Sequence, residues 1–234
     1  MNNFLNSIPA VVKNIIGINI ILWLATLVLP GVFARFGIII DLTDILGMHY
    51  WAASKFNVAQ LITYIFMHGG FEHLFFNMFA LYMFGAVLEN LWGTKRFLIY
   101  YIVTGIGAGL IQQIFWTIEF GGQIAAINDT MARTPAIAIE LLEQKKIFLN
   151  MPITVGASGS VFGLLLAFGW LFPETRLMML FLPIPIKARI FVLIYGVAEL
   201  FLGVAQFSGD SVAHFAHLGG MLFGAVLIMM WKKK

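Results

Sequence analysis

The segment Val155–Leu164, VGASGSVFGL, decides the fold, because it places a serine between glycines at the start of a long apolar run. No charged residue follows it until Glu174. A serine in this position is either a small residue that lets membrane helices pack closely or a nucleophile held inside a bilayer. The segment alone favours packing, since small residues are common where membrane helices meet. The rest of the chain decides between the two interpretations.

The composition identifies the class of protein. Of 234 residues, 61% are hydrophobic and only 11% are charged, and the mean hydropathy is +0.93. Soluble domains carry about 25% charged residues, so we expect an all-α integral membrane protein with one domain, 1–234. The net charge of +3 comes from basic residues scattered between apolar segments, which argues against a nucleic-acid surface. The absence of cysteine excludes disulfides and thiolate metal sites.

Six apolar segments are predicted to span the membrane as helices. They cover residues 15–33, 73–92, 97–116, 158–172, 190–207 and 213–231. Residues 35–63 are too polar to span and too apolar for a free loop, so we expect a structured segment in the membrane interface. Residues 117–154 form an outer insert. There Thr134 and Pro135 start a helix that is either amphipathic and interfacial or an ordinary surface helix.

The basic residues predict the orientation. With six spans both termini lie on one side, which carries nine lysines and arginines, whereas the other side carries five. An excess of basic residues marks the cytoplasmic side. We therefore expect a multi-pass protein of a bacterial cytoplasmic membrane with both termini in the cytoplasm. Ser158 then begins its helix at the outer side.

His217 lies a few residues into the last apolar segment, at a depth similar to that of Ser158. An ionisable residue inside a span is costly and indicates a function. Gly220 and Gly224 follow on the same helix face, and Gly159 starts a Gly-x-x-x-Gly pair beside the serine. Such faces let two helices approach closely enough for a serine oxygen to reach an imidazole nitrogen at about 3 Å. A packing seam alone would explain the glycines but not the histidine.

Other polar and aromatic residues fit the same place. His73 and Asn77 are four residues apart, so two neutral donors point the same way, as a developing oxyanion requires. A polar pair that links two helices is the alternative. Phe162, one turn after Ser158, can pack against the imidazole of His217, although an ordinary lipid-facing aromatic fits its position too.

Glu199 lies in the middle of the fifth segment. A carboxyl group at that position indicates a function in general, but we favour an internally hydrogen-bonded carboxyl that faces the bundle. It lies about ten residues from the cytoplasmic end of its helix, which predicts a position too deep to orient His217.

Three sequence motifs, in their order along the chain, resemble those of the rhomboid intramembrane serine proteases. They are HGGFEHLFFN at His68–Asn77, GASG at Gly156–Gly159, and AHLGG at Ala216–Gly220 with Gly224 after it. Each motif alone is weak, but the three together are specific, and the resemblance covers nearly the whole chain. One departure is Leu91, which stands where many members carry an arginine two residues after a glutamate, here Glu89.

The resemblance implies a six-transmembrane-helix rhomboid-like bundle with a membrane-embedded first loop. It implies a Ser158 nucleophile and a His217 general base without an acidic third member, and an oxyanion pocket from His73, Asn77 and the Ser158 backbone N–H. The supporting residues are Gly156, Gly159, Phe162, Gly220 and Gly224. The implied activity is cleavage of transmembrane segments of other membrane proteins near the outer face, with lateral substrate entry past the fifth helix. We expect no metal, no cofactor and no nucleic-acid partner.

Two alternatives compete with this hypothesis. A non-catalytic rhomboid-like protein would bind membrane clients without cutting them, but it would be expected to lack the serine or the histidine, and both are present. A small channel or transporter would need polar residues at several depths. Here they cluster near the outer face, with Glu199 as the exception, and the sequence shows no convincing internal repeat.

Overall fold

Helices form most of the chain in the computed structural model, which describes residues 7–179, 182–205 and 212–232. Within these described residues, five helical segments are long and apolar enough to cross a membrane, and a sixth apolar helix is shorter. The five are α2 (Ala10–Ala34), α5 to α6 (Phe71–Trp92), α7 (Thr94–Arg133), α10 (Ala188–Ala205) and α11 (His214–Lys232), and the shorter one is α9 (Ser158–Leu171). The predicted all-α membrane bundle is confirmed. The last two residues predicted for the fifth span, 206–207, lie outside the described residues.

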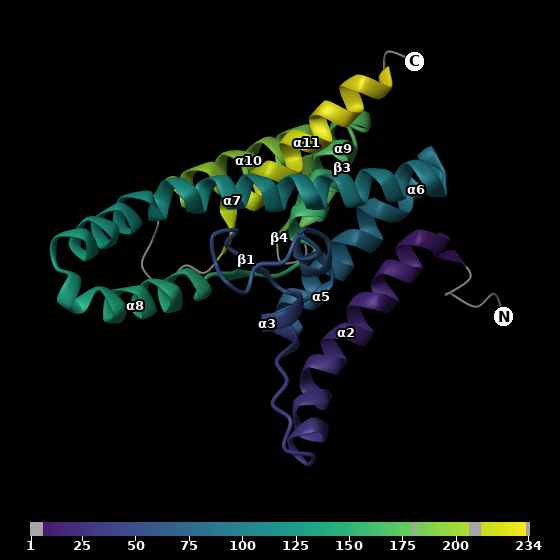
Figure 1. Ribbon diagram of the computed structural model, residues 1–234. Coiled ribbons are helices and arrows are strands. Elements are labelled where there is room, and N and C mark those ends of the chain that lie inside the picture. The colour runs from purple at the N-terminus through teal and green to yellow at the C-terminus, as the bar shows by residue number, and fades with distance from the viewer. Residues whose placement is uncertain (1–6, 180–181, 206–211, 233–234) are drawn as a thin grey trace.

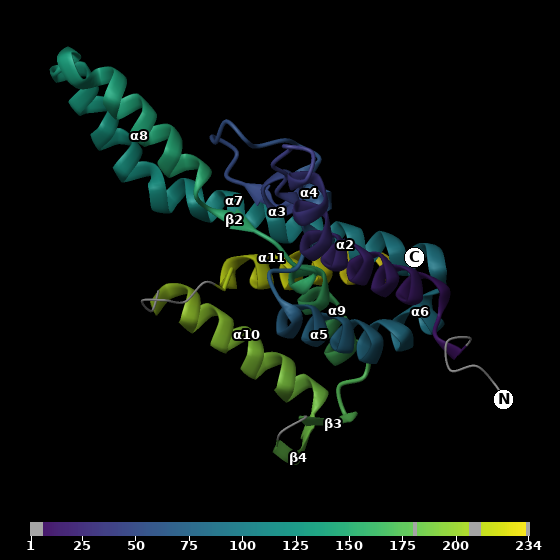
Figure 2. The same cartoon turned by 90° about the horizontal axis from the view of Figure 1, so that it is seen from below.

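Helix α9 lies at the centre of the bundle. It packs against α7, α11 and α10, while α2 and α10 lie on different sides of it (Figure 2). Most of its side chains are buried apolar groups or glycines. A helix that is hydrophobic all round belongs in the interior of a bundle, so the composition of α9 explains why Ser158 begins a central helix rather than a peripheral one.

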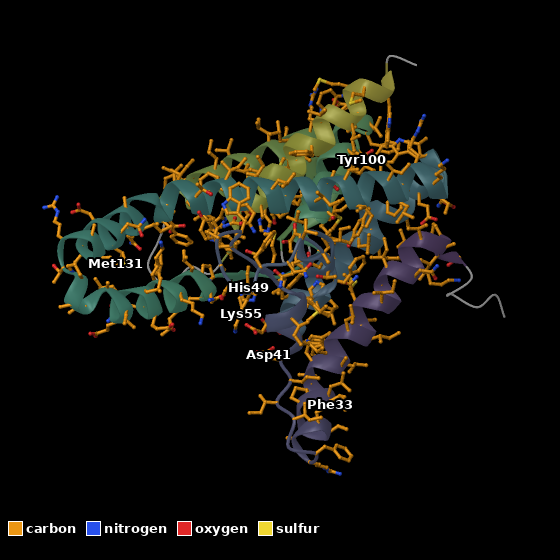
Figure 3. The ribbon with its side chains drawn as sticks, in the orientation of Figure 1. Phe33, Asp41, His49, Lys55, Tyr100 and Met131 are labelled. Carbon is orange, nitrogen blue, oxygen red and sulfur yellow. The ribbon has the colours of Figure 1, made fainter. Side chains whose placement is uncertain are left out.

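The segment between α2 and α5 is structured, as predicted for residues 35–63. It contains α3 (Leu42–Leu46), β1 (Met48–His49), α4 (Gln60–Thr63) and the 3-10 turn η1 (Tyr64–Phe66). Asp41 caps α3 by accepting the N–H groups of Thr43 and Asp44. The Asp44 carboxylate accepts from Lys55 Nζ at 2.7 Å, and its carbonyl oxygen lies 2.9 Å from His49 Nε2. Figure 3 shows His49 and Lys55 together beside α7.

Strand β1 connects this segment to the residues that precede Ser158. It pairs antiparallel with β2 (Ile153–Thr154), so that Met48 lies opposite Thr154. On the other side, Gln113 Nε2 of α7 donates to the carbonyl of His49 at 2.6 Å. The residues that lead into α9 are therefore held by pairing with the first loop, which is itself bonded to α7.

The predicted outer insert is a helical hairpin. Helix α7 does not end near Trp116, as predicted, but runs 40 residues to Arg133, about 60 Å in length. The turn η3 (Pro135–Ile137) leads into α8 (Ala138–Asn150), which returns along α7. The hairpin projects away from the start of α2 and the end of α11 (Figures 1 and 2), with Met131 near its tip (Figure 3).

Contacts between the two helices explain the extension of α7. The rings of Phe120 and Phe148 lie 5.2 Å apart, and Lys145 donates to Asn128 at 2.8 Å. Gly121 and the glycine after it lower helix stability by about 1 kcal/mol each in isolation. Packing against α8 offsets that loss, which a sequence pattern alone does not reveal.

The connector between α9 and α10 is a β-hairpin of β3 (Arg176–Met179) and β4 (Leu182–Lys187). Pro185 is compatible with this pairing because a two-stranded sheet has only edge strands. Glu174 forms ion pairs with Lys187 at 2.7 Å and Arg189 at 3.0 Å. These pairs fasten the hairpin to the start of α10.

Glu89 of α6 (Ala86–Trp92) binds the start of α2. Its two carboxylate oxygens accept the backbone N–H groups of Val11 and Val12 at 2.9 and 2.8 Å. The first N–H groups of a helix lack partners within the helix, and a negative charge there is favourable. Pro9, the residue before α2, makes no side-chain cap. Glu89 thus has a structural partner in the start of α2, although Leu91 stands where many rhomboid proteases carry an arginine.

Candidate active site

Ser158 is the first residue of α9, and Gly156 shapes the turn that leads to it. Gly156 has φ +132°, which favours glycine, and its N–H donates to the carbonyl of Tyr64 at 2.9 Å. A Cβ atom at this position would lie 2.7 Å from His73 Nε2 and 3.6 Å from Ser158 Oγ. The absence of a side chain therefore leaves open the space that His73 and Ser158 share.

His217 lies on the first turn of α11 and faces Ser158. Its Nε2 atom is 2.8 Å from Ser158 Oγ. Its ring stacks on Phe162, with centroids 4.2 Å apart and an angle of 7° between the planes. Phe162 is one turn after Ser158 on the same face of α9. One helix therefore supplies both the hydroxyl group and the surface against which the imidazole rests.

Glycines allow α9 and α11 to come this close. A Cβ atom on Gly220 would overlap the carbonyl oxygen of Gly159, and one on Gly159 would overlap Ala108 of α7. A Cβ atom on Gly224 would overlap the hydroxyl of Tyr100. The contact is thus backbone against backbone along one face of α11, the face that also carries His217. Figure 3 marks Tyr100 on α7, where that helix lies against α11.

Glu199 contacts His217, so the expectation that it lies too deep is wrong. Its Oε2 atom is 2.9 Å from His217 Nδ1 and 2.6 Å from His214 Nδ1. That expectation was based on the distance of Glu199 from the cytoplasmic end of its helix. Counted from the other end, Glu199 is six residues before the last residue of α10, about 9 Å along the axis. His217 is three residues into α11, so the two depths are similar.

Glu199, His214 and His217 are also the described residues whose donor atoms are grouped closely enough to hold a metal ion, all within 4.8 Å of one another. The distances between the carboxylate oxygen and the two imidazole nitrogens fit hydrogen bonds better than metal ligation. Atoms that bind zinc at about 2.0–2.1 Å in a tetrahedron lie about 3.3 Å apart. The separation of 2.9 Å here is an ordinary length for an N–H···O bond, and that of 2.6 Å is a short one.

The two predicted oxyanion donors lie on the first turns of α5 (Phe71–Ala80). His73 is partly buried and its Nε2 atom faces the space beside Gly156. Asn77 is 6% exposed, and one amide N–H donates to the carbonyl of His73 at 3.0 Å. An asparagine amide carries a second N–H that remains for another acceptor. His73 Nε2 and Ser158 Oγ thus lie on either side of the space at Gly156, while Asn77 uses one N–H within its own helix.

The ring of His68 packs against the ring of His73. The two rings meet edge to face with centroids 5.0 Å apart, and His68 is 3% exposed. Burial, with a smaller contribution from His73, lowers the pKa of His68 to about 3. The His68 ring is therefore neutral at physiological pH and places no positive charge next to His73.

A cavity of about 460 Å³ lies beside this group of residues. Its lining includes Gln112, Thr154 and His214, from α7, β2 and α11. Polar side chains facing lipid would be costly, and they are tolerated where they line a cavity. His214, which contacts Glu199, thus borders a space large enough for water.

The family model described as Rhomboid domain matches residues 55–234. The chain belongs to the rhomboid family. Among curated rhomboid proteins, Rhomboid protease GluP of Bacillus subtilis is 31% identical over 99 residues, which are 42% of this chain and 18% of that protein. Rhomboid-like protein 11, chloroplastic, of Arabidopsis thaliana is 29% identical over 74% of this chain and 52% of its own length. Rhomboid-like protease 3 of Toxoplasma gondii is 26% identical over 81% and 58%.

The rhomboid match has two consequences. It supports an intramembrane protease at the level of the family, since two of these relatives are named as proteases, and a multi-pass membrane protein. The chain spans between 18% and 58% of the length of these three rhomboid relatives. Because rhomboid proteins of chloroplasts and mitochondria match as well as bacterial ones, the bacterial membrane and the cytoplasmic termini stay predictions.

Proposed function

We propose that the protein is an intramembrane serine endopeptidase that cuts transmembrane segments of other membrane proteins near the outer face. The observation that carries this proposal is the 2.8 Å contact between His217 Nε2 and Ser158 Oγ at the start of a central apolar helix. A serine hydroxyl is a weak nucleophile unless an adjacent base takes its proton. An imidazole nitrogen within hydrogen-bond reach meets that requirement.

The reaction follows from these two groups. Ser158 Oγ attacks the peptide carbonyl while His217 Nε2 takes the hydroxyl proton, and the new O–C bond gives a tetrahedral intermediate. The C–N bond then breaks, and His217 returns the proton to the leaving amine. Water adds to the acyl-serine with the same histidine as base, which releases the carboxylic acid and restores the hydroxyl. We propose that this water comes from the cavity that His214 lines, since His214 is three residues before His217 on α11.

The developing oxyanion lies at the start of α9. The first N–H groups of a helix have no acceptor within it and carry partial positive charge, and the position of Ser158 as the first residue of α9 supports its backbone N–H as a donor. His73 Nε2 faces the same space from α5, and Asn77 lies one turn further on. Neutral donors of this kind stabilise negative charge strongly where water is excluded.

A substrate must expose a peptide bond that its helix normally keeps hydrogen-bonded. We expect the protease to prefer transmembrane segments with small or helix-weakening residues near their outer ends, because such residues lower the cost of local unwinding. The chain binds no nucleic acid in this proposal, and its partners are transmembrane substrates and the bilayer. Lateral entry past α10 remains an expectation from the family resemblance.

Labelling with a fluorophosphonate probe tests the proposal. An activated serine displaces fluoride from phosphorus and becomes covalently labelled, so the wild-type protein in detergent should label and the Ser158→Ala variant should not. Ser160→Ala is a matched control, because Ser160 Oγ donates to the carbonyl of Tyr101 at 2.8 Å and faces away from the site. A folded wild-type protein that fails to label would favour the alternative, a non-catalytic rhomboid-like protein that binds membrane clients.

Replacing the oxyanion donor His73 should slow the chemical step. We expect His73→Ala to lower kcat by about 10²- to 10³-fold with little change in KM, because the donor acts on charge that develops only in the transition state. Steady-state cleavage of a transmembrane peptide in micelles measures both constants. Glu72→Gln, at an exposed neighbouring position on α5, serves as the control. A rise in KM without a fall in kcat would place His73 in substrate binding instead.

A further inference from the structure

We infer that Glu199 is a positioning residue of the catalytic group, so that the site works as a Ser158–His217–Glu199 triad in which His214 holds the carboxyl group. The inference rests on the proposed serine-protease function and departs from the dyad that the family resemblance implies. Its basis is a single oxygen atom, Glu199 Oε2, which lies within hydrogen-bond distance of two imidazole nitrogens, at 2.6 Å from His214 Nδ1 and 2.9 Å from His217 Nδ1.

These contacts select the tautomer of His217. A carboxylate oxygen only accepts hydrogen bonds, so the proton of the neutral His217 ring is on Nδ1. The lone pair is then on Nε2, the atom that lies 2.8 Å from Ser158 Oγ. The serine can donate its proton only to a nitrogen that has none. The carboxylate on one side of the ring therefore makes the other side a base, as in triads where the acidic member orients the imidazole.

The stacking contact with Phe162 cannot provide this selection. A flip of the His217 ring by 180° about its last side-chain torsion exchanges Nδ1 with a carbon atom and keeps the plane stacked on Phe162. The contact of Nε2 with Ser158 Oγ also distinguishes the two orientations, but only a partner at Nδ1 that accepts and cannot donate fixes which nitrogen carries the proton. Among the described residues Glu199 supplies that partner, because its Oε2 atom accepts from one end of the ring while Ser158 contacts the other.

Burial explains why His214 belongs to the arrangement. Glu199, His214 and His217 are 8%, 7% and 8% exposed. A carboxylate inside a membrane span is costly unless donors satisfy it. His214 and His217 are three residues apart on α11, so both rings reach α10 from the same face of their helix. His214 keeps the carboxylate in place while His217 goes through the proton transfers of the reaction.

Kinetics of substitutions at Glu199 test the inference. We expect Glu199→Gln to lower kcat on the order of 10²- to 10⁴-fold with KM little changed, because the amide can donate to Nδ1 and so stabilise the unproductive tautomer. Glu199→Asp keeps an acceptor and should retain at least tenfold more activity than Glu199→Gln. Glu143→Gln removes an exposed carboxyl group on α8, away from the site, and should leave kcat within about twofold. A Glu199→Gln protein with wild-type kcat would overturn the inference.

A spectroscopic measurement separates this inference from the proposed function. Nitrogen-15 NMR of histidine-labelled protein distinguishes the two neutral tautomers, and the chain has five histidines, so loss of one signal in His217→Gln assigns the ring. In the inactive Ser158→Ala protein with Glu199 intact, we expect His217 to carry its proton on Nδ1. A proton on Nε2 in this folded variant would refute the positioning role even if the wild-type protein cleaves its substrate. Cleavage that survives Ser158→Ala would instead refute the serine-protease proposal and leave the tautomer result standing.

Discussion

Replacing either Ser158 or His217 by alanine should reduce proteolysis to the assay background. In serine proteases whose nucleophile and base act as a unit, loss of either lowers kcat by about 10⁴- to 10⁶-fold. Here the two side chains share one 2.8 Å contact between α9 and α11. We therefore expect Ser158→Ala, His217→Ala and the double variant to be equally inactive, because the second substitution removes nothing that still functions. Cleavage of a transmembrane substrate in liposomes measures the loss.

The control for this prediction is the stability of the variants. Ser158→Ala removes one side-chain hydrogen bond, which contributes about 0.5–1.5 kcal/mol, so its thermal unfolding in detergent should stay near that of the wild type. His217→Ala also removes the ring that stacks on Phe162, and a somewhat lower Tm is expected. Activity above background in a folded form of either variant would contradict the assignment of nucleophile and base.

The sequence predicted the central elements of the fold because each carries its own signal. The apolar segments have the length of membrane spans, and glycines at the spacing of one helix face mark where α9 and α11 touch. The serine at the start of α9 and the histidine near the start of α11 follow from the same pattern. The structure brings these two side chains to hydrogen-bond distance.

The elements that the sequence did not predict depend on contacts between distant residues. The extension of α7 to Arg133 is held by α8, through rings such as Phe120 and Phe148. The β3–β4 hairpin was not predicted, because prolines within a segment argue against a strand unless it lies at the edge of a sheet. The contact between Glu199 and His217 was missed because the depth of a residue depends on where both ends of its helix lie. The i, i+3 spacing of His214 and His217 was the signal that could have indicated a shared partner.

The close approach of α9 and α11 should not tolerate a side chain at Gly220. A Cβ atom there overlaps the carbonyl oxygen of Gly159, and a backbone atom cannot move aside as a flexible side chain can. Helix α11 must shift away from α9, and His217 shifts with it. A displacement of about 1 Å between reacting groups can lower a rate about 10²-fold. We expect Gly220→Ala to lower kcat at least that much, and Gly220→Val to abolish activity.

The effect at Gly220 should combine a loss of rate with a loss of stability, because overpacking of a filled interior costs about 1–3 kcal/mol. Gly121→Ala is the matched control, since a Cβ atom at Gly121 of α7 meets nothing within 4 Å. That change should leave kcat unchanged and stabilise the helix by up to about 1 kcal/mol. The rate of fluorophosphonate labelling and the Tm of both variants measure the two effects. If Gly220→Ala labels at the wild-type rate, then the serine and histidine do not depend on backbone contact between α9 and α11, and their geometry must be set by Phe162 and Glu199 alone.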